Sequence, residues 1–432
     1  MLVRLNSLWE QVRTGLWFLP LLMTLAAVAL AWLTLGTRLN LGQSTVWWLH
    51  SGSASDAASL LSSLLASMIT MATLAISITM VVLTLAANQL GPRLIRIFMA
   101  DRRTQTMLGF FLATIVYVVL VLRSINSELS AGKVPNLAVS VGTAMVLACV
   151  FLLLFFINHL ARSIVADTII NRIGTDLDAA AAEMLPDAGA APAAGERPAL
   201  GDGGAILRFK RGGYIEGIDH GALVECAREA GAVIDLDLRP GQHILPHGAH
   251  GRIHPAAALT DTLLRAVSNH VVLAGERTGN GDLEFLIRQL VEIALRALSP
   301  GVNDPFTAIA VIDRLGVSVA SIMRRDMETG VWRDEEGRPR LLTETTTFRG
   351  LADVAFNQIR QAGEGEPAIL IRLVSTLTPL LEQARDEEQR RVLREHIELV
   401  TGAGERSVRD GYDLAALRAV GPGKFEAGRR SE

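Results

Sequence analysis

Residues Leu61 to Gln89 read LSSLLASMITMATLAISITMVVLTLAANQ and contain no Asp, Glu, Lys or Arg. A helix of about 20 apolar residues spans a bilayer core, because lipid offers no partners for backbone polar groups and a helix satisfies its own. Polar residues recur in this stretch at steps of three, four or seven, which confines them to one helix face. They are Ser63, Ser67, Thr70, Ser77, Thr84 and Asn88. The stretch therefore predicts a transmembrane helix with an ordered polar stripe.

Three further stretches are long and apolar enough to span a bilayer. The four predicted membrane helices cover residues 15–35, 61–89, 106–122 and 137–160, and none contains a charged residue. Arg4 and Arg13 precede the first helix as they would a signal peptide, but its apolar stretch is too long for one. Trp17 and Trp32 stand where interfacial aromatic anchors would. We therefore interpret the first helix as retained and residues 1–162 as a transmembrane domain.

Arginines in the loops set the expected orientation. After the second helix, Gly91-Pro92 breaks the helical pattern and four arginines follow: Arg93, Arg96, Arg102 and Arg103. Of Lys and Arg, the loop after the first helix carries only Arg38, and the loop after the third carries only Arg123 and Lys133. Short loops rich in Lys and Arg stay in the cytoplasm, so both termini are expected there. Besides setting topology, the four arginines could contact anionic lipid headgroups or concentrate anions at a pore mouth.

The rest of the chain mixes apolar and charged residues as a soluble domain does. The expected organisation is a helical extension at 163–185, an Ala-, Gly- and Pro-rich linker at 186–204, a small α+β unit at 205–258 and a mainly helical domain at 259–432. The fold class is thus a membrane α-helical domain of four transmembrane helices plus a cytoplasmic α+β domain with a helical C-terminal part. A formal net charge of −3 gives no basic footprint, so nucleic acid is not an expected partner. Cys149 and Cys226 fall in different environments and are not expected to pair.

Within 205–258, strands are expected at 205–211 and 214–218 around Gly212-Gly213, a helix at 220–230, and strands at 232–238 and 242–245. Four histidines cluster at the end of this unit: His243, His247, His250 and His254. Such spacings can serve zinc when a helix or tight loop aligns the rings. Neighbouring glycines and prolines argue against a helix, and no Cys or nearby carboxylate completes the set. Solvated loop histidines are favoured, and no metal is assigned.

A helix corner is the strongest pattern in the soluble half. Asp282 is expected to cap one helix, Pro300-Gly301 ends it, and Asn303-Asp304 caps the next with Pro305 at its first position. Asn303 and Asp304 could coordinate a cation, and N–H groups at the second helix start could bind an anion. The same residues, with Ser299, are what a tight corner demands, and this structural role is favoured. Helices are also expected at 348–361, 368–385 and 386–401, after a hairpin around Glu336-Gly337.

One further histidine stands at the cytoplasmic end of the fourth membrane helix. His159 lies just before Arg162, where its ordinary pKa near 6.5 would let it sense pH. An interfacial position with no special role is the favoured interpretation.

These segments together resemble a bacterial family of predicted membrane proteins, catalogued as domain-of-unknown-function family twenty-two fifty-four. In the membrane half the resemblance rests on Ser67-Met68-Ile69-Thr70, Asn88-Gln89-Leu90-Gly91-Pro92-Arg93 and Asp101-Arg102-Arg103-Thr104-Gln105. In the soluble half it rests on Gly213-Tyr214-Ile215 with Ile218-Asp219, Arg239-Pro240-Gly241, Gly275-Glu276-Arg277-Thr278 and the run from Ser299 to Ala308. The family shows a small or acidic residue and an apolar one where this chain has Gln242 and His243, so the histidine cluster is particular to this chain. The resemblance implies a bacterial inner-membrane location and supplies no activity.

No enzyme signature appears, whether a phosphate-binding loop, a nucleophile elbow, a His-Glu-x-x-His or a Cys-x-x-Cys motif, so no catalysis and no cofactor are expected. The leading hypothesis is a homo-oligomeric channel-like protein whose polar stripe lines a pathway for an ion or small ligand. The alternative is a membrane-anchored sensor or scaffold, in which the stripe only packs helices together and the soluble domain binds a ligand or partner. A secondary transporter comes third, because the membrane helices lack charged residues and inverted repeats.

Overall fold

The structure is a computed structural model that describes residues 17–36, 53–90, 99, 101–125, 134–163, 166–189, 197–201, 203–279 and 281–421. The side chains of 86–90 and 162–163 lie outside that description. The chain divides into two compact units. We call residues 5–168 the membrane unit and the part from Ile169 onward the C-terminal unit. Each unit is described by itself.

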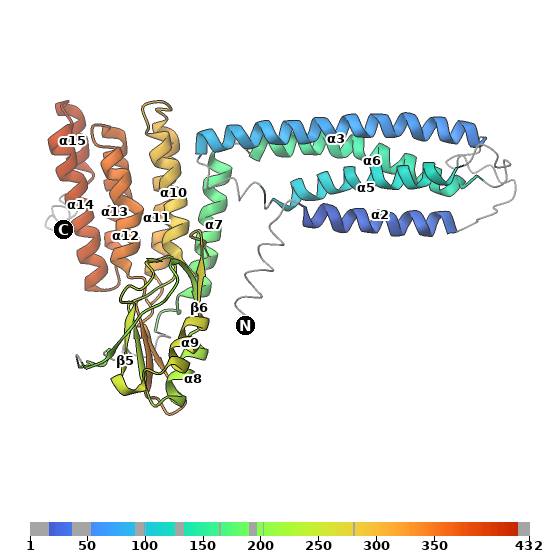
Figure 1. Ribbon diagram of the computed structural model, residues 1–432. Coiled ribbons are helices and arrows are strands. Elements are labelled where there is room, and N and C mark those ends of the chain that lie inside the picture. Colours follow the sequence, from blue (N-terminus) through green and yellow to red (C-terminus); the bar gives the residue numbers. More distant parts are fainter. Residues whose placement is uncertain are drawn as a thin grey trace. The chain divides into compact units, whose positions relative to one another are not determined.

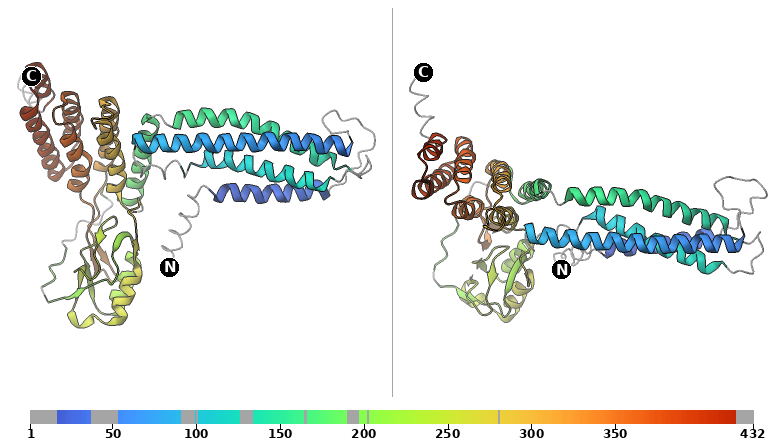
Figure 2. Two further views of the ribbon diagram at one scale, coloured as in Figure 1. Left: turned by 45° about the horizontal axis from the view of Figure 1, so that its top comes forward. Right: turned by 90° about the horizontal axis from the view of Figure 1, so that it is seen from above.

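The described helices of the membrane unit lie side by side along their length (Figures 1 and 2). They are α2 (Phe18–Gly36), α3 (Ala54–Leu90), α5 (Arg102–Ser124) and α6 (Asn136–Ser163). Helix α5 packs against the other three, and its Phe111, Tyr117 and Val118 are fully or almost fully buried. Small residues let the helices approach closely, as where Gly109 of α5 contacts Pro20 of α2. The four helices predicted from sequence are thus present.

Helix α3 begins earlier than predicted, at Ala54 instead of Leu61. The cause is a reciprocal cap: Ser53 Oγ accepts from the Asp56 N–H, and an Asp56 carboxylate oxygen accepts from the Ser53 N–H. At 1.5 Å per residue, its 37 residues extend about 55 Å, well beyond a hydrocarbon core of about 30 Å. One or both ends of α3 therefore project out of the bilayer core.

Among the described residues, five helices are long and apolar enough to cross a membrane, namely the four above and α11 (Pro305–Met323) of the C-terminal unit. Half of the most apolar 18-residue stretch of α11 is buried inside the protein, whereas only 17% of the corresponding stretch of α3 is buried. Helix α11 also carries Asp313 and Arg314, which pair with Arg372 and Asp178. Its apolar side chains thus cover neighbouring helices, and we assign α11 to the core of the C-terminal unit.

Helix α7 (Ala166–Met184) belongs to the C-terminal unit from Ile169 onward, and the unit continues into a lobe of strands and short helices. One sheet has the order β1-β5-β3-β8-β7 and the other β4-β2-β6. The strands are β1 (Ala205–Leu207), β2 (Gly213–Ile218), β3 (Val233–Leu236), β4 (His243–Ile244), β5 (Gly251–His254), β6 (Val271–Ala274), β7 (Val331–Arg333) and β8 (Pro339–Thr343). The helices of the lobe are α8 (His220–Glu229), η3 (Ala256–Ala258) and α9 (Asp261–His270). Its core includes Leu223, Ile234 and Leu236, all fully buried.

The remaining helices stand side by side, with the strands at one end of them (Figure 1). They are α10 (Leu283–Ala297), α11, α12 (Phe348–Ala362), α13 (Pro367–Glu382), α14 (Glu387–Ser407) and α15 (Gly411–Ala419). Asp282 caps α10 and Asp304 caps α11, each accepting a backbone N–H three residues on, and Pro305 holds the first position of α11. These caps are the ones that the sequence predicts.

The topology of the lobe adds to the sequence expectation in one respect and corrects it in another. The sequence predicts strands on both sides of Gly212-Gly213 without assigning their partners, and in the structure β1 pairs with β5, while β2 pairs with β4 and β6. The α+β unit also extends past residue 258, because β6 and the predicted hairpin β7–β8 belong to these sheets, with β8 parallel to β3. Hydrogen bonds between distant strands decide both outcomes, and local sequence patterns do not encode them.

The predicted linker at 186–204 is anchored at its described ends. The N–H of Asp326 donates to Pro186 O at 3.1 Å, and the N–H of Gly189 donates to Asp326 at 2.7 Å. At the other end, Arg197 pairs with Asp235 of β3 at 2.5 Å. The described parts of this stretch therefore hold defined positions on the C-terminal unit.

Candidate functional site

Helix α3 has two opposite faces. The face that packs on the other membrane helices consists of Ala54, Ala57, Leu61, Met68, Ala72 and Ala75, all buried. At about 100° per residue, the predicted polar stripe lies on the opposite side of the helix. Its described side chains, Ser63, Ser67, Thr70, Ser77 and Thr84, are all exposed. The stripe therefore takes no part in the packing of the protomer's own bundle, and its hydroxyls are available to something outside it.

Three hydroxyls of the stripe donate hydrogen bonds to backbone carbonyls of their own helix. Ser67 donates to Ser63 O at 2.9 Å, Thr70 to Ala66 O at 3.0 Å and Thr84 to Met80 O at 2.9 Å. Each hydroxyl has a single proton, so these bonds leave the oxygen lone pairs facing outward as acceptors. Such a row of acceptors can replace part of the hydration shell of a cation, or it can accept bonds from donors of another chain.

Three residues of the predicted membrane site lie wholly or partly outside the described residues. The side chain of Asn88 and the whole of Arg93 and Arg96 lie outside the described residues. Arg102 and Arg103 form the first turn of α5 and are exposed. Their exposure leaves both guanidinium groups accessible to headgroups or solutes.

Polar contacts that the sequence analysis did not identify tie the membrane helices together. The Tyr117 hydroxyl of α5 lies 2.9 Å from the Thr34 hydroxyl of α2 and donates to Ala138 O of α6 at 3.1 Å. At the other end of α5, its cap residue Asp101 lies 2.7 Å from Nε2 of His159. His159 thus has a partner that links the start of α5 to the end of α6. The acidic partner stands 58 residues away, beyond the reach of local patterns.

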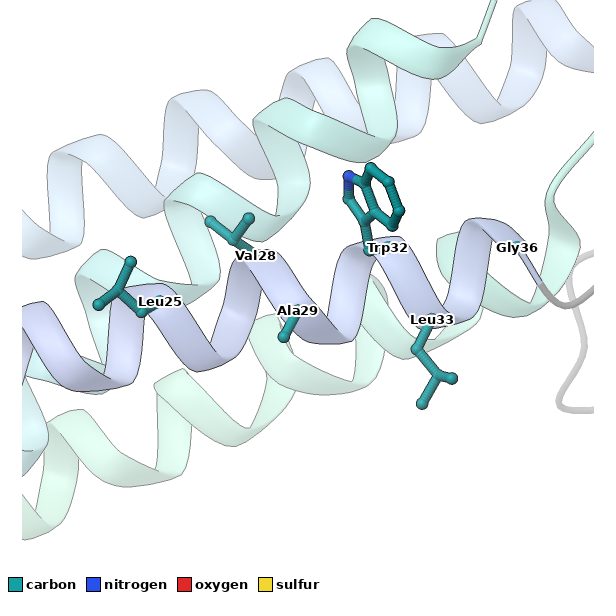
Figure 3. A pocket seen from close by; sticks show the side chains of 6 residues that line it. All are labelled: Leu25, Val28, Ala29, Trp32, Leu33 and Gly36. Atoms are coloured by element: carbon teal, nitrogen blue, oxygen red, sulfur yellow. The ribbon is translucent and has the colours of Figure 1, made fainter.

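One hollow opens on the surface of the membrane unit. Figure 3 shows that the side chains lining it all project from α2. They are Leu25, Val28, Ala29, Trp32, Leu33 and Gly36, and the hollow measures about 640 Å³. No charged or hydroxyl side chain lines it, and its one polar side-chain group is the indole N–H of Trp32. It has the character of a lipid-facing surface.

A charged contact joins α7 to α11 within the C-terminal unit. Arg314 donates to Asp178 at 2.6 Å and to Ser318 Oγ at 2.9 Å, while Ser318 donates to the other Asp178 oxygen at 2.7 Å. The guanidinium lies directly on Gly174, where an added Cβ would come within 2.0 Å of Arg314 Nε. Ser318 is fully buried. We call Gly174, Asp178, Arg314 and Ser318 the α7 clasp. It holds the helix that follows the last membrane helix.

A second charged cluster brings together two segments quoted for the family resemblance. Arg277 binds Asp282 through two nitrogens at 2.6 and 3.1 Å, and Arg239 Nη1 lies 2.8 Å from Glu284. Both carboxylates are almost completely buried. Gly241, at φ +81°, places its backbone against this pair: an added Cβ would lie 1.9 Å from Asp282 Oδ2. The acids neutralise the arginines, so the cluster stabilises the junction of strands and helices.

The predicted corner residues are engaged in local structure. The hydroxyl of Ser299 donates to Arg296 O at 2.7 Å, and the N–H of Asp304 donates to Ala297 O at 2.8 Å. Asp304 accepts from both the N–H and the hydroxyl of Thr307, at 3.1 and 2.6 Å, and these bonds lower the pKa of its carboxyl. Asn303 adopts a left-handed conformation with φ 48°. The corner thus has the geometry of a helix connection.

The four clustered histidines do not converge. His250 is buried and uses both ring nitrogens: Nδ1 accepts from the Phe209 N–H at 3.1 Å, so Nε2 donates to Leu245 O at 2.9 Å. Burial lowers the pKa of this imidazole. His243 contacts the ring of Tyr214, and His247 is exposed in the loop. Among the described residues, no group of three or more His, Cys, Asp or Glu side chains is placed to hold a metal ion.

Comparison with known proteins agrees with this architecture. The chain is 28% identical to the uncharacterized proteins Mb1321c of Mycobacterium bovis and Rv1290c of Mycobacterium tuberculosis, over 96% of this chain and 81% of each relative. No solved structure matches the chain. The model of a family described as predicted membrane protein, DUF2254, matches residues 13–379. The membrane helices, the exposed stripe and the C-terminal unit as far as residue 379 fall within that match, and the chain belongs to this family of predicted membrane proteins.

Proposed function

We propose that this protein is a homo-oligomeric, channel-like protein of the bacterial inner membrane, in which copies of α3 surround a pathway for an ion or small ligand. The observation that carries the proposal is the exposed row of Ser67, Thr70, Ser77 and Thr84 on the side of α3 that faces away from its own bundle. Acceptor oxygens exposed to lipid tails would have no partners, which disfavours an isolated protomer. Assembly around an axis gives them water or ions instead.

In this proposal both termini lie in the cytoplasm and the C-terminal unit regulates the pathway. The arginines after α3 support the orientation, because such residues remain on the cytoplasmic side. Their positive charge would also raise the concentration of anions near the cytoplasmic opening. The proposal assigns no catalytic role and no cofactor to the chain.

Cysteine accessibility tests whether the stripe meets water. Ser67→Cys and Ser77→Cys are compared with Val150→Cys, a lipid-facing control on the exposed side of α6. The background carries Cys149→Ser and Cys226→Ser, and the reagent is a charged, membrane-impermeant thiosulfonate. We expect both stripe cysteines to react and the control to stay unmodified. Equal protection of all three positions would contradict a hydrated pathway.

Ion flux tests conduction directly. Reconstituted protein should pass ions, and Thr70→Leu or Ser77→Leu should reduce the flux, because leucine removes the acceptor oxygens from the stripe. Leu74→Ile, an exposed position on the same helix, serves as a control that keeps α3 apolar there. Absence of flux under any pH, tension or voltage would argue against a conduit.

A membrane-anchored sensor or scaffold is the second candidate, and the α7 clasp favours it. Arg314 and Ser318 of α11 both bind Asp178 of α7, so a ligand that moved α11 would also move the helix following the membrane unit. In this case the stripe would pack protomers together through hydroxyl contacts. Leucine at Thr70 and Ser77 would then leave partner binding unchanged. A secondary transporter stays third, since the charge-free spans offer no coupling site.

A further inference from the structure

Helices α12 and α14 pack on each other along a seam that contains polar side chains. Arg349 of α12 donates to Glu395 of α14 at 2.7 Å. One turn further along α12, Asp353 Oδ1 lies 3.2 Å from Nε2 of His396 on α14. The same carboxylate oxygen accepts from the side-chain amide of Asn357 at 3.1 Å. The seam thus places a titratable imidazole between two helices of the C-terminal unit.

His396 is the buried member of this seam. Its side chain is only 3% exposed, whereas that of Asp353 is 42% exposed. The imidazole meets the ring of Phe356 edge to face, with the ring centroids 5.9 Å apart. A carboxylate only accepts hydrogen bonds, so the neutral imidazole carries its proton on Nε2 and leaves Nδ1 unprotonated. Nδ1 is buried and has no hydrogen-bond partner among the described residues. A second proton would therefore enter the ring where no acceptor receives it.

Charged groups of both helices act on the imidazole. Burial has the largest effect and lowers the pKa of His396; Asp353 and Glu395 raise this pKa, and Arg349 and Arg360 of α12 lower it further. Helices α13 and α15 also pack on α14. The charged residues of these two helices are Arg372, which pairs with Asp313, Glu382, Asp413, and Arg418, which pairs with Glu405. The imidazole is thus neutral at neutral pH while the helices are packed.

We propose that His396 is an acid-sensitive joint of the C-terminal unit, and that protonation of its Nδ1 loosens α14 from α12. While the helices are packed, the new N–H is buried without an acceptor, and the half-exposed carboxylate of Asp353 attracts the added charge only through solvent screening. Once the helices separate, the N–H reaches water. The proposal is independent of whether α3 lines a pathway.

The direction of the pH effect follows from the lowered pKa. In the packed form the pKa of His396 lies below its ordinary value of 6.5. The packing therefore has its full stability above that value and loses it as pH falls below 6.5. If the imidazole stays neutral in the packed form, the opening equilibrium rises by up to about tenfold between about pH 7.5 and 5.5.

Hydrogen exchange read by mass spectrometry tests the joint in the full-length protein at these two pH values, with rates corrected for the intrinsic effect of pH. Peptides of α12 and α14 should exchange up to about tenfold faster at the lower pH. His396→Gln should remove this difference, because its amide keeps an N–H for Asp353 and does not titrate. His270→Gln is the control and should keep the difference: it removes a partly exposed imidazole 3.7 Å from Asp219 in the lobe.

Asp353→Asn separates the two titratable partners at a half-exposed position. It removes a charge that favours protonation of His396 and leaves the buried imidazole in place, so the faster exchange at low pH should persist. Loss of this pH dependence in Asp353→Asn would assign it to the carboxylate and overturn the proposal. Equal exchange of the wild-type protein at both pH values would also overturn it, as would an unchanged pH dependence in His396→Gln.

Discussion

Replacing Asp178 with alanine should loosen α7 from the C-terminal unit. The change removes the acceptor of two bonds, from Arg314 at 2.6 Å and from Ser318 at 2.7 Å. It also leaves a guanidinium that is only 11% exposed without its carboxylate. Bonds to charged groups contribute about 1.5–3 kcal/mol each, and the partial exposure of Asp178 reduces the sum. We therefore expect α7 to open more easily by about 2–3 kcal/mol.

Hydrogen exchange read by mass spectrometry measures this opening in the full-length protein. A loss of 2–3 kcal/mol corresponds to amide exchange roughly 30- to 150-fold faster in the peptides of α7, at about 1.4 kcal/mol per tenfold. Peptides of α5 should be unchanged, because they belong to the membrane unit.

Asp176→Ala is the matched control. It removes the same charge from the same helix two residues away, at an exposed position outside the clasp. A second variant, Arg314→Met, should add little to Asp178→Ala, because each change already breaks the same ion pair. If Asp178→Ala and Asp176→Ala gave the same exchange in α7, the clasp would not hold this helix and the reasoning would be refuted.

Two further outcomes are expected in the C-terminal unit. Gly241→Ala should lower the thermal midpoint of unfolding strongly, because a φ of +81° strains alanine and the new Cβ would lie 1.9 Å from Asp282 Oδ2. Gly337→Ala is the control: this glycine also has a positive φ, but its new Cβ would have no atom within 4 Å, so the variant isolates the effect of backbone strain. Burial alone would raise the pKa of Asp334, but the bond from Arg340 and other bonds lower it to about 2. Its stabilising effect is then complete above the ordinary pKa of 3.8 and lost as pH falls toward 2. Asp334→Asn should therefore flatten the dependence of the thermal midpoint on pH in that range.

Helix positions and helix ends followed from local sequence, because both depend on nearby residues. Hydrophobic length located the four membrane helices, and capping chemistry located the starts of α10 and α11 at Asp282 and Asp304. The predicted start of α3, at Leu61, is later than the observed start at Ala54, and this difference also has a local cause. The prediction began where charge ended, whereas Ser53 and Asp56 build a cap that starts the helix earlier.

Partners distant in sequence were not predictable from these patterns. The sequence predicts the two strands beside Gly212-Gly213 but not their partners, because the pairing of β1 with β5 depends on which edge a distant strand can reach. The same holds for Asp101 and His159, which meet across 58 residues. Each of these residues looks ordinary in its own segment. Their pairing appears only when the helices are packed.

The sequence distinguishes two faces of α3, and the structure shows which of them packs on the other helices. Spacing alone separates the hydroxyl residues from the small and apolar ones, but it does not say which face the protomer buries. The structure buries the face of Ala57, Leu61 and Met68, because alanines permit close helix contact and hydroxyls are not needed for it. Packing within the protomer therefore does not explain Ser67 and Thr70. In the proposed assembly their acceptor oxygens face water or a second chain, and the reactivity of cysteines at positions 67 and 77 distinguishes these two surroundings.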